Sequence, residues 1–186
     1  SEFLREVDGP LAVADALTIA RAVLSGLRAV HERGLLHRDV KPGNIFLTDE
    51  GRVKLIDFGS ARNAAREATS GLSVLVSEPF APVEQYGRKR GQGPWTDVYA
   101  LGATLYRMLT GRMIPAGLDR WDVSTNATRE PDPLIPLKDV PGIQLTPSLS
   151  DAVQRALSVR AGDRFQNVAE FDDAIVKAAA EAGVRL

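Results

Sequence analysis

Two short polar segments carry side chains that could act on a phosphate group. The first, His-Arg-Asp-Val-Lys-Pro-Gly-Asn, occupies residues 37–44, and the second, Asp-Phe-Gly, occupies residues 57–59. Together they offer carboxylates, an ammonium group and a side-chain amide. Transfer of a phosphoryl group requires a carboxylate near the attacking hydroxyl, positive charge beside the moving phosphate and oxygen ligands for Mg²⁺. The residue types therefore suit phosphoryl transfer.

The order of these segments resembles the catalytic loop and the metal-binding loop of protein kinases. The resemblance implies that Asp39 orients the substrate hydroxyl as a base and that Lys41 contacts the γ-phosphate of ATP. It also implies that Asn44 and Asp57 hold Mg²⁺. Phe46 falls where the family places an apolar residue beneath the adenine of ATP, and packing within a hairpin explains it equally well.

The position of Lys41 favours one class of acceptor. Ser/Thr kinases carry a lysine two residues after the catalytic aspartate, as here, whereas tyrosine kinases place their basic residue differently. The resemblance therefore implies a Ser/Thr protein kinase that uses ATP and Mg²⁺ and acts on a protein substrate. Small-molecule kinases of the aminoglycoside or choline type share a His-x-Asp…Asn loop and are an alternative. Lys41 and the Asp-Phe-Gly segment argue against them.

Residues 77–84, Ser-Glu-Pro-Phe-Ala-Pro-Val-Glu, resemble the end of a kinase activation segment. We expect that segment to cover about residues 57–84. Glu84 anchors this alignment, because a buried carboxylate needs a partner. The resemblance implies that Arg164 is that partner; an exposed arginine before a helix is the alternative. The alignment puts Ser77 where kinases usually carry a threonine near the catalytic aspartate and lysine. The Ala-Pro-Glu motif is one residue longer here, which we interpret as a subfamily variant.

Three further residues are expected to support the loop. Asp97 resembles the aspartate at the start of a buried central helix that accepts N–H bonds from the catalytic loop. An ordinary carboxylate favoured by the helix dipole is the alternative. His37 and Phe58 fall on the stacked column that joins the two lobes of active kinases, so His37 is expected to be structural.

Hydroxyl groups in the expected activation segment could be phosphorylated and pair with Arg38, as in kinases that are ordered by phosphorylation. Solvated loop hydroxyls are at least as plausible for any one of them. The candidates are Thr69, Ser70 and Ser73.

Hydrophobic periodicity predicts the elements that position these residues. The predicted helices cover 13–32, 96–110, 147–159 and a segment from 167 onward, and the predicted strands cover 35–36, 45–47 and 53–56. Turn residues at 48–51 predict a hairpin, and Gly34 and Gly111 are placed to end two helices. Residues 60–94 are expected to form a functional loop, and residues 112–146 to be mostly irregular. The expected fold is mainly α within the α+β kinase class, with a small β-hairpin that carries the catalytic and metal loops.

The composition is that of a globular protein. The chain has 186 residues, 44% of them hydrophobic and 25% charged, and a formal net charge of −1. Nothing in this balance indicates nucleic acid or a membrane surface as a partner. The sequence holds no cysteine, which excludes disulfides and thiol chemistry. No apolar run approaches the roughly 20 residues that a membrane helix needs.

Several parts of a kinase are expected on the N-terminal lobe: a Gly-rich loop, a strand lysine and a helix glutamate that pairs with it. None of the three is found in the 186 residues. We therefore expect residues 1–186 to be the C-terminal lobe of a longer kinase, with the missing N-lobe as its partner. The chain alone is expected to transfer phosphate poorly. A non-catalytic pseudokinase or half-kinase module is the main alternative.

The run Pro-Val-Glu-Gln-Tyr at 82–86, with abundant Ala, Arg and Gly, is associated with bacterial sequences. We expect a cytoplasmic domain, which a membrane-anchored parent could carry. The segment itself is expected to make no membrane contact.

Overall fold

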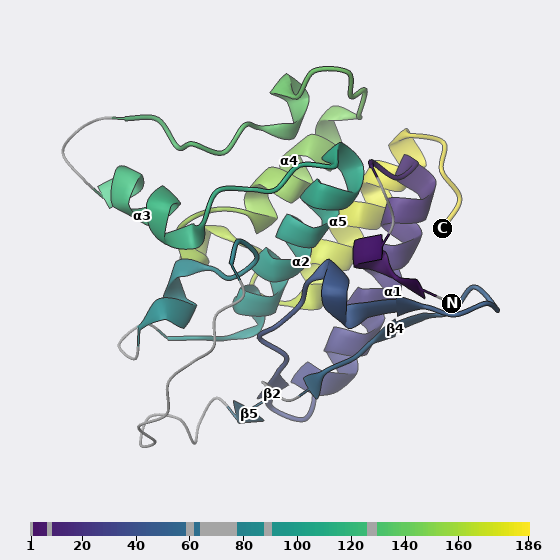
Figure 1. Ribbon diagram of the computed structural model, residues 1–186, viewed down its shortest axis with the longest axis horizontal. Coiled ribbons are helices and arrows are strands. Elements are labelled where there is room, and N and C mark those ends of the chain that lie inside the picture. Colours follow the sequence, from purple (N-terminus) through teal and green to yellow (C-terminus); the bar gives the residue numbers. More distant parts are fainter. Residues whose placement is uncertain (1, 7–8, 59–61, 64–77, 88–90, 126–129) are drawn as a thin grey trace.

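The structure, a computed structural model, describes residues 2–6, 9–58, 62–63, 78–87, 91–125 and 130–186. Within these ranges five α-helices hold most of the residues in regular secondary structure (Figure 1). They are α1 (Val13–His31), α2 (Pro94–Thr110), α3 (Gly117–Thr125), α4 (Pro147–Ala156) and α5 (Val168–Glu181). The expectation of a mainly helical fold with a small β-hairpin is confirmed.

Helix α1 forms where the apolar period predicted it and ends one residue earlier, at His31. Ala16, Ala20, Val23 and Leu27 of the predicted stripe are buried, and they face the neighbouring helices α2 and α5. Gly34 follows in the left-handed conformation with φ 69°. A residue without a Cβ adopts this conformation at low cost, so the chain can turn there into the next strand.

Helix α2 lies at the centre of the helical part and contacts α1, α4 and α5 (Figure 1). It begins at Pro94, two residues before the predicted start, and nearly all of its residues are buried. Such a helix belongs inside a core, because it has no polar face to present to water. Gly111 ends it as predicted, with φ 69° and an N–H that donates to the Arg107 carbonyl at 2.7 Å.

Capping residues start the last two helices. The Thr146 hydroxyl accepts from the Leu149 N–H at 3.3 Å, and Asn167 accepts from the Glu170 N–H at 3.0 Å. At the start of α5 a reciprocal capping box is present only in part. The Glu170 carboxylate accepts from the Gln166 N–H, one residue before the cap, and from the Asn167 side-chain amide. Either way, N–H groups at the helix start gain acceptors.

Helix α3 was not predicted from the sequence, which indicated that residues 112–146 are mostly irregular. Its apolar residues do not form the stripe on which periodicity depends. Instead it buries a charge: Arg120 is 1% exposed and makes two hydrogen bonds to Asp132, at 2.9 and 2.7 Å. A third bond joins Arg120 to the Tyr99 hydroxyl of α2 at 3.0 Å. Paired burial of this kind fixes α3 without an apolar face.

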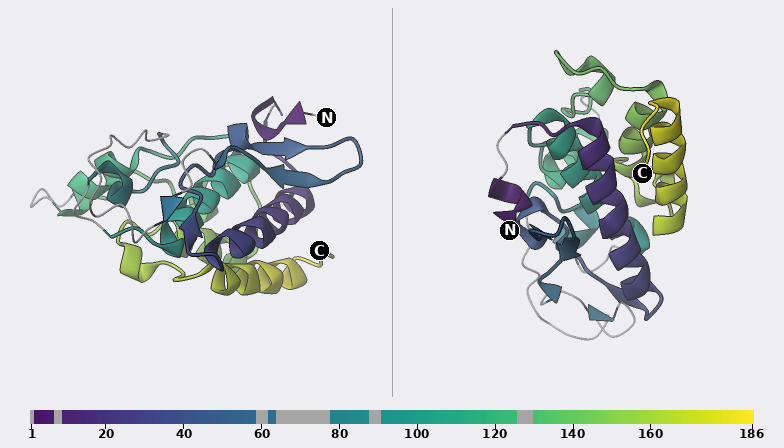
Figure 2. Two further views of the ribbon diagram at one scale, coloured as in Figure 1. Left: turned by 90° about the horizontal axis from the view of Figure 1, so that it is seen from below. Right: turned by 90° about the vertical axis from the view of Figure 1, so that its right-hand side faces the viewer.

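Two small antiparallel sheets complete the described structure. One has the order β1-β3-β4, formed by Glu2–Phe3, Ile45–Leu47 and Val53–Leu55, and the other pairs β2 (Leu35–Leu36) with β5 (Arg62–Asn63). The predicted hairpin is β3–β4, and it projects from one edge of the helices (Figure 2). Ile45 is fully buried on one side, whereas Phe46 lies on the other side and is half-buried. The hairpin thus positions the loop at residues 37–44, which precedes it, relative to Asp57 and Phe58, which follow it.

Among the residues that the structure describes, no helix combines the length and the apolar character that a membrane crossing requires.

Candidate active site

Three of the predicted site residues lie together between β2 and β3. The Lys41 ammonium lies 2.9 Å from Asp39 Oδ2. The Asn44 amide donates to the same carboxylate oxygen and to the Asp39 carbonyl, both at 2.8 Å. The 3₁₀ turn Pro42–Asn44 makes this possible, since the Asn44 N–H donates to the Lys41 carbonyl at 2.9 Å and returns the chain to Asp39.

Asp97, in the first turn of α2, holds the backbone of the loop that carries Asp39. Its side chain is fully buried and accepts from the backbone N–H of His37 at 2.9 Å and of Arg38 at 2.7 Å. The expected role of Asp97 is confirmed. A further contact was not expected: His31 Nε2, at the end of α1, lies 2.7 Å from Asp97 Oδ2. A buried carboxylate accepts strong, charge-assisted hydrogen bonds. These bonds restrict the motion of the backbone segment that donates them.

His37 is neutral in this arrangement. It is fully buried, and burial lowers the pKa of its imidazole. Its Nε2 lies 3.2 Å from the Ile56 carbonyl, which can only accept, and its Nδ1 lies 3.3 Å from the Asp39 N–H, which can only donate. These partners specify the tautomer with the proton on Nε2. The ring also packs edge-on against Phe58, with 4.8 Å between centroids. The expected contact between His37 and Phe58 is confirmed.

Acidification is expected to destabilise the fold through His37. Because burial lowers its pKa below 6.5, the unfolded chain takes up a proton that the folded chain excludes. The contribution of His37 to stability is complete above about pH 6.5 and falls as the pH drops towards the folded-state pKa. Through His37 alone, the free energy of unfolding changes by at most about 1.4 kcal/mol per pH unit. Urea unfolding of the wild type and His37→Gln at several pH values measures it, and equal slopes in both would contradict this prediction.

Two non-glycine residues of the predicted motifs adopt left-handed backbone conformations. Arg38 has φ 67° and Asp57 has φ 63°. Such conformations cost on the order of 1–3 kcal/mol each and persist only where the surroundings hold them. At Arg38 the N–H is held by Asp97, and the carbonyl accepts from Gln85 Nε2 at 2.8 Å. Strain is therefore concentrated in the two segments to which the sequence assigned chemistry.

The hairpin brings Asp57 to the same end as Asn44. The Ile56 N–H donates to the Asn44 carbonyl at 2.9 Å, so Asp57 follows β4 next to the start of β3. The Asn44 side-chain nitrogen donates to Asp39, so the amide oxygen is the atom of this side chain that can act as a metal ligand. A carboxylate and an amide oxygen are hard ligands of the kind that Mg²⁺ binds, usually with phosphate oxygens and water. The donor set at this end of the hairpin thus fits Mg²⁺.

Phe46 lies on β3, two residues after Asn44. It is half-buried, and the ring of Phe3 packs edge-on against it, with 5.2 Å between centroids. The strand β1 that carries Phe3 was not predicted; it pairs Phe3 with Phe46. The proposed contact of Phe46 with adenine stays a prediction.

The predicted pair of Glu84 and Arg164 is confirmed. The two side chains lie 80 residues apart in sequence and are bonded at 2.6 and 3.2 Å, with exposures of 3% and 1%. Arg164 also donates to the carbonyls of Ser158 and Val159, and the Thr96 hydroxyl donates to Glu84 at 3.1 Å. This pair ties the 3₁₀ turn Val83–Tyr86 to the segment before α5.

The remaining candidates lie outside the described residues. These are Ser77 and the possible phosphorylation sites Thr69, Ser70 and Ser73. Besides His31, sequence reasoning missed a second residue that contacts the loop. Gln85, next to Glu84, is 2% exposed and contacts the Arg38 carbonyl; its only sequence signal was its place beside the predicted anchor.

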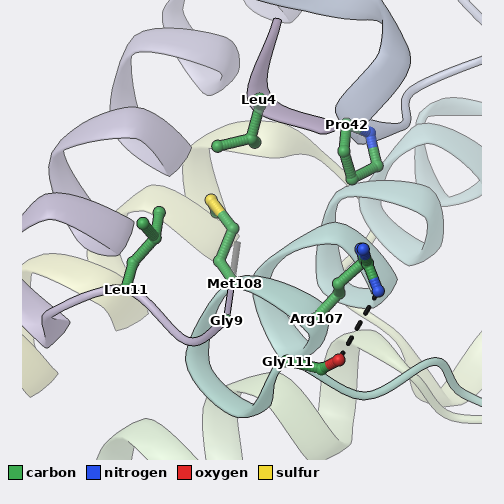
Figure 3. A pocket seen from close by; sticks show the side chains of 7 residues that line it. All are labelled: Leu4, Gly9, Leu11, Pro42, Arg107, Met108 and Gly111. Carbon is green, nitrogen blue, oxygen red and sulfur yellow. Dashed lines mark hydrogen bonds between the residues drawn. The ribbon is translucent and has the colours of Figure 1, made fainter. Parts of the chain in front are cut away.

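A small cavity lies apart from this cluster, between the N-terminal segment and the end of α2 (Figure 3). Its volume is about 30 Å³. Its lining residues are Leu4, Gly9, Leu11, Pro42, Arg107, Met108 and Gly111. The space suits a water molecule or two, whereas small-molecule sites usually measure about 300–1,000 Å³. It is therefore not a nucleotide site.

Comparison with known proteins agrees with this geometry. The protein kinase domain family matches residues 2–165. The chain belongs to the protein kinase domain family.

Several bacterial proteins are similar to the chain. A probable serine/threonine-protein kinase of Corynebacterium efficiens is 35% identical over 176 residues, which cover 91% of this chain and 26% of that protein. Serine/threonine-protein kinase PknA of Mycobacterium tuberculosis is 33% identical, with 95% of this chain and 39% of the relative covered. Serine/threonine-protein kinase Pkn1 of Myxococcus xanthus is 35% identical, with 94% and 26% covered. The chain thus spans about a quarter to two fifths of these relatives, and their bacterial origin agrees with the sequence expectation.

Proposed function

We propose that this chain is the C-terminal lobe of a Ser/Thr protein kinase that transfers the γ-phosphate of ATP to serine or threonine hydroxyls of a protein. The observation that carries the proposal is the cluster of Asp39, Lys41 and Asn44 on a loop whose backbone is held by Asp97. Phosphoryl transfer depends mainly on positioning and charge stabilisation, so a rigid loop with these groups suits it. The named relatives support the acceptor class.

Each group has a distinct role in the proposal. Asp39 orients the attacking hydroxyl and accepts its proton. Lys41, which lies 2.9 Å from Asp39, places a positive charge beside the transferred phosphate. Asn44 and Asp57 hold Mg²⁺, which neutralises charge on the phosphate oxygens when bound. Phe46 contacts the adenine, so the nucleotide lies along the hairpin edge of the helical part.

The proposal also covers the segments around the site. Residues 57–84 form the activation segment, whose far end is anchored by the bond between Glu84 and Arg164. The proposal assigns to Ser77, which lies outside the described residues, a hydroxyl that acts together with Asp39 and Lys41. Phe58 is 47% exposed, and we propose that an N-terminal lobe covers it when the nucleotide cleft is complete.

The isolated 186-residue chain is expected to transfer phosphate at least about a hundredfold more slowly than a protein in which it is joined to an N-terminal lobe. Half of the nucleotide cleft is lost without that lobe, so positioning of ATP is lost as well. The mass of the natural protein tests the premise, which requires roughly 80 more residues on the N-terminal side. Labelling with [γ-³²P]ATP and mapping of the phosphorylated residues then measures transfer. Equal rates for the two proteins, or labelling of tyrosine alone, would contradict the proposal.

A further inference from the structure

The peptide that leads into Asp39 is held at both ends. On one side the Arg38 carbonyl accepts a hydrogen bond from Gln85 Nε2 at 2.8 Å. On the other side the Asp39 N–H donates to His37 Nδ1 at 3.3 Å. Gln85 is 2% exposed and Arg38 is 7% exposed, so the contact between them is inside the protein. The orientation of this peptide sets where the Asp39 side chain begins.

The bond from Gln85 compensates a strained backbone. Arg38 has φ 67°, a conformation that a side chain with a Cβ rarely adopts. Relaxation to a negative φ rotates the chain about the N–Cα bond of Arg38. That rotation would swing the Arg38 carbonyl away from Gln85 and displace Asp39 from Lys41 and Asn44. Since Asp97 holds only the N–H side of Arg38, Gln85 supplies the opposing contact on the carbonyl side.

Gln85 is itself fixed by its neighbours. Its N–H donates to the Pro82 carbonyl at 3.0 Å within the Val83–Tyr86 turn. The preceding residue, Glu84, is bonded to Arg164 at 2.6 Å. Two buried hydrogen bonds, Arg164 to Glu84 and Gln85 to the Arg38 carbonyl, are therefore joined by the covalent link between Glu84 and Gln85.

We propose that Gln85 is a positioning residue for Asp39: its amide holds the Arg38 carbonyl and thereby couples the Glu84–Arg164 anchor to the catalytic carboxylate. The inference deepens the proposed kinase function and rests on it for its effect on catalysis. The geometric part concerns the Arg38–Asp39 peptide alone. It can be tested whether or not phosphate is transferred.

The catalytic test uses Gln85→Met in the full-length natural protein, because methionine has a similar volume and no N–H donor. We expect kcat to fall about tenfold and KM for ATP to change less than about twofold, since the displaced group acts on the hydroxyl and not on nucleotide binding. Gln154→Met is the matched control, because Gln154 is exposed on α4. An unchanged kcat in Gln85→Met would overturn the proposal.

The geometric test is spectroscopic. Arg38–Asp39 is the single Arg-Asp step in these 186 residues. Labelling Arg with ¹³C at the carbonyl and Asp with ¹⁵N therefore gives one signal from this chain, which Asp39→Asn identifies. We expect Gln85→Met to shift the Arg38 carbonyl resonance and to speed amide exchange over residues 39–44, and Gln154→Met to change neither.

The two tests separate the possible failures. If the wild-type protein transfers no phosphate but Gln85→Met moves the carbonyl signal, the kinase function fails and the positioning contact stands. If the signal and the exchange rates stay as in the wild type, the positioning role is overturned whatever the activity. Should Gln85→Met fail to fold, Gln85→Glu takes its place, because it keeps the shape and replaces the donor with an acceptor. A carbonyl signal unchanged in Gln85→Glu counts against the proposal equally.

Discussion

Replacement of Arg164 by alanine is expected to lower the free energy of unfolding by about 3–5 kcal/mol. The guanidinium is bonded to Glu84, which is itself 3% exposed, so truncation leaves a buried carboxylate without its cation. Three backbone carbonyls, those of Ser158, Val159 and Trp95, lose a donor as well. Denaturant unfolding followed by circular dichroism measures the loss. A change below about 1 kcal/mol would show that the pair is not the anchor we describe.

Two further variants sharpen this test. Arg160→Ala is the matched control, because Arg160 is exposed four residues earlier, and its effect is expected within about 0.5 kcal/mol. The double variant Glu84→Leu/Arg164→Met removes both charges. It is expected to recover most of the loss, since apolar residues of similar volume can replace a buried ion pair. Failure to recover would assign the loss to packing around Arg164 and to the carbonyls that lose their donor, and not to the unpaired charge.

Replacement of Asp39 by asparagine is expected to lower the rate of phosphoryl transfer by about 10²–10⁴-fold. Asparagine keeps the shape and cannot accept the hydroxyl proton, and it removes the negative charge that lies 2.9 Å from the Lys41 ammonium. The side chain is partly accessible, so the fold is expected to stay intact. Thermal unfolding checks this, with Asp151→Asn, an exposed residue of α4, as the control.

Sequence reasoning could predict the candidate site because its signals are local. The residues at 37–44 and 57–59 carry their chemistry in fixed spacing, and the hairpin between them is encoded by alternation and turn residues. The pair of Glu84 and Arg164 could also be predicted. A carboxylate expected in the core requires a cation, and the family resemblance supplied one.

What the sequence did not reveal depends on contacts between distant residues. His31 and Gln85 reach the loop from a helix end and from a turn, and neither residue type is distinctive at those positions. Helix α3 was missed because Arg120, paired with Asp132, takes the place of an apolar stripe. The left-handed conformation of Arg38 was equally hidden, because it is maintained by Asp97 and Gln85 and not by local propensity.

The most direct test is a single-turnover measurement with the full-length natural protein, [γ-³²P]ATP and Mg²⁺, comparing the wild type with Asp39→Asn and identifying the labelled residues by mass spectrometry. The proposed function predicts transfer to serine or threonine that is fast in the wild type and slower by about 10²–10⁴-fold in the variant. Equal transfer by the two proteins, or none by the wild type, would contradict the assignment of Asp39 and its neighbours as a kinase catalytic site.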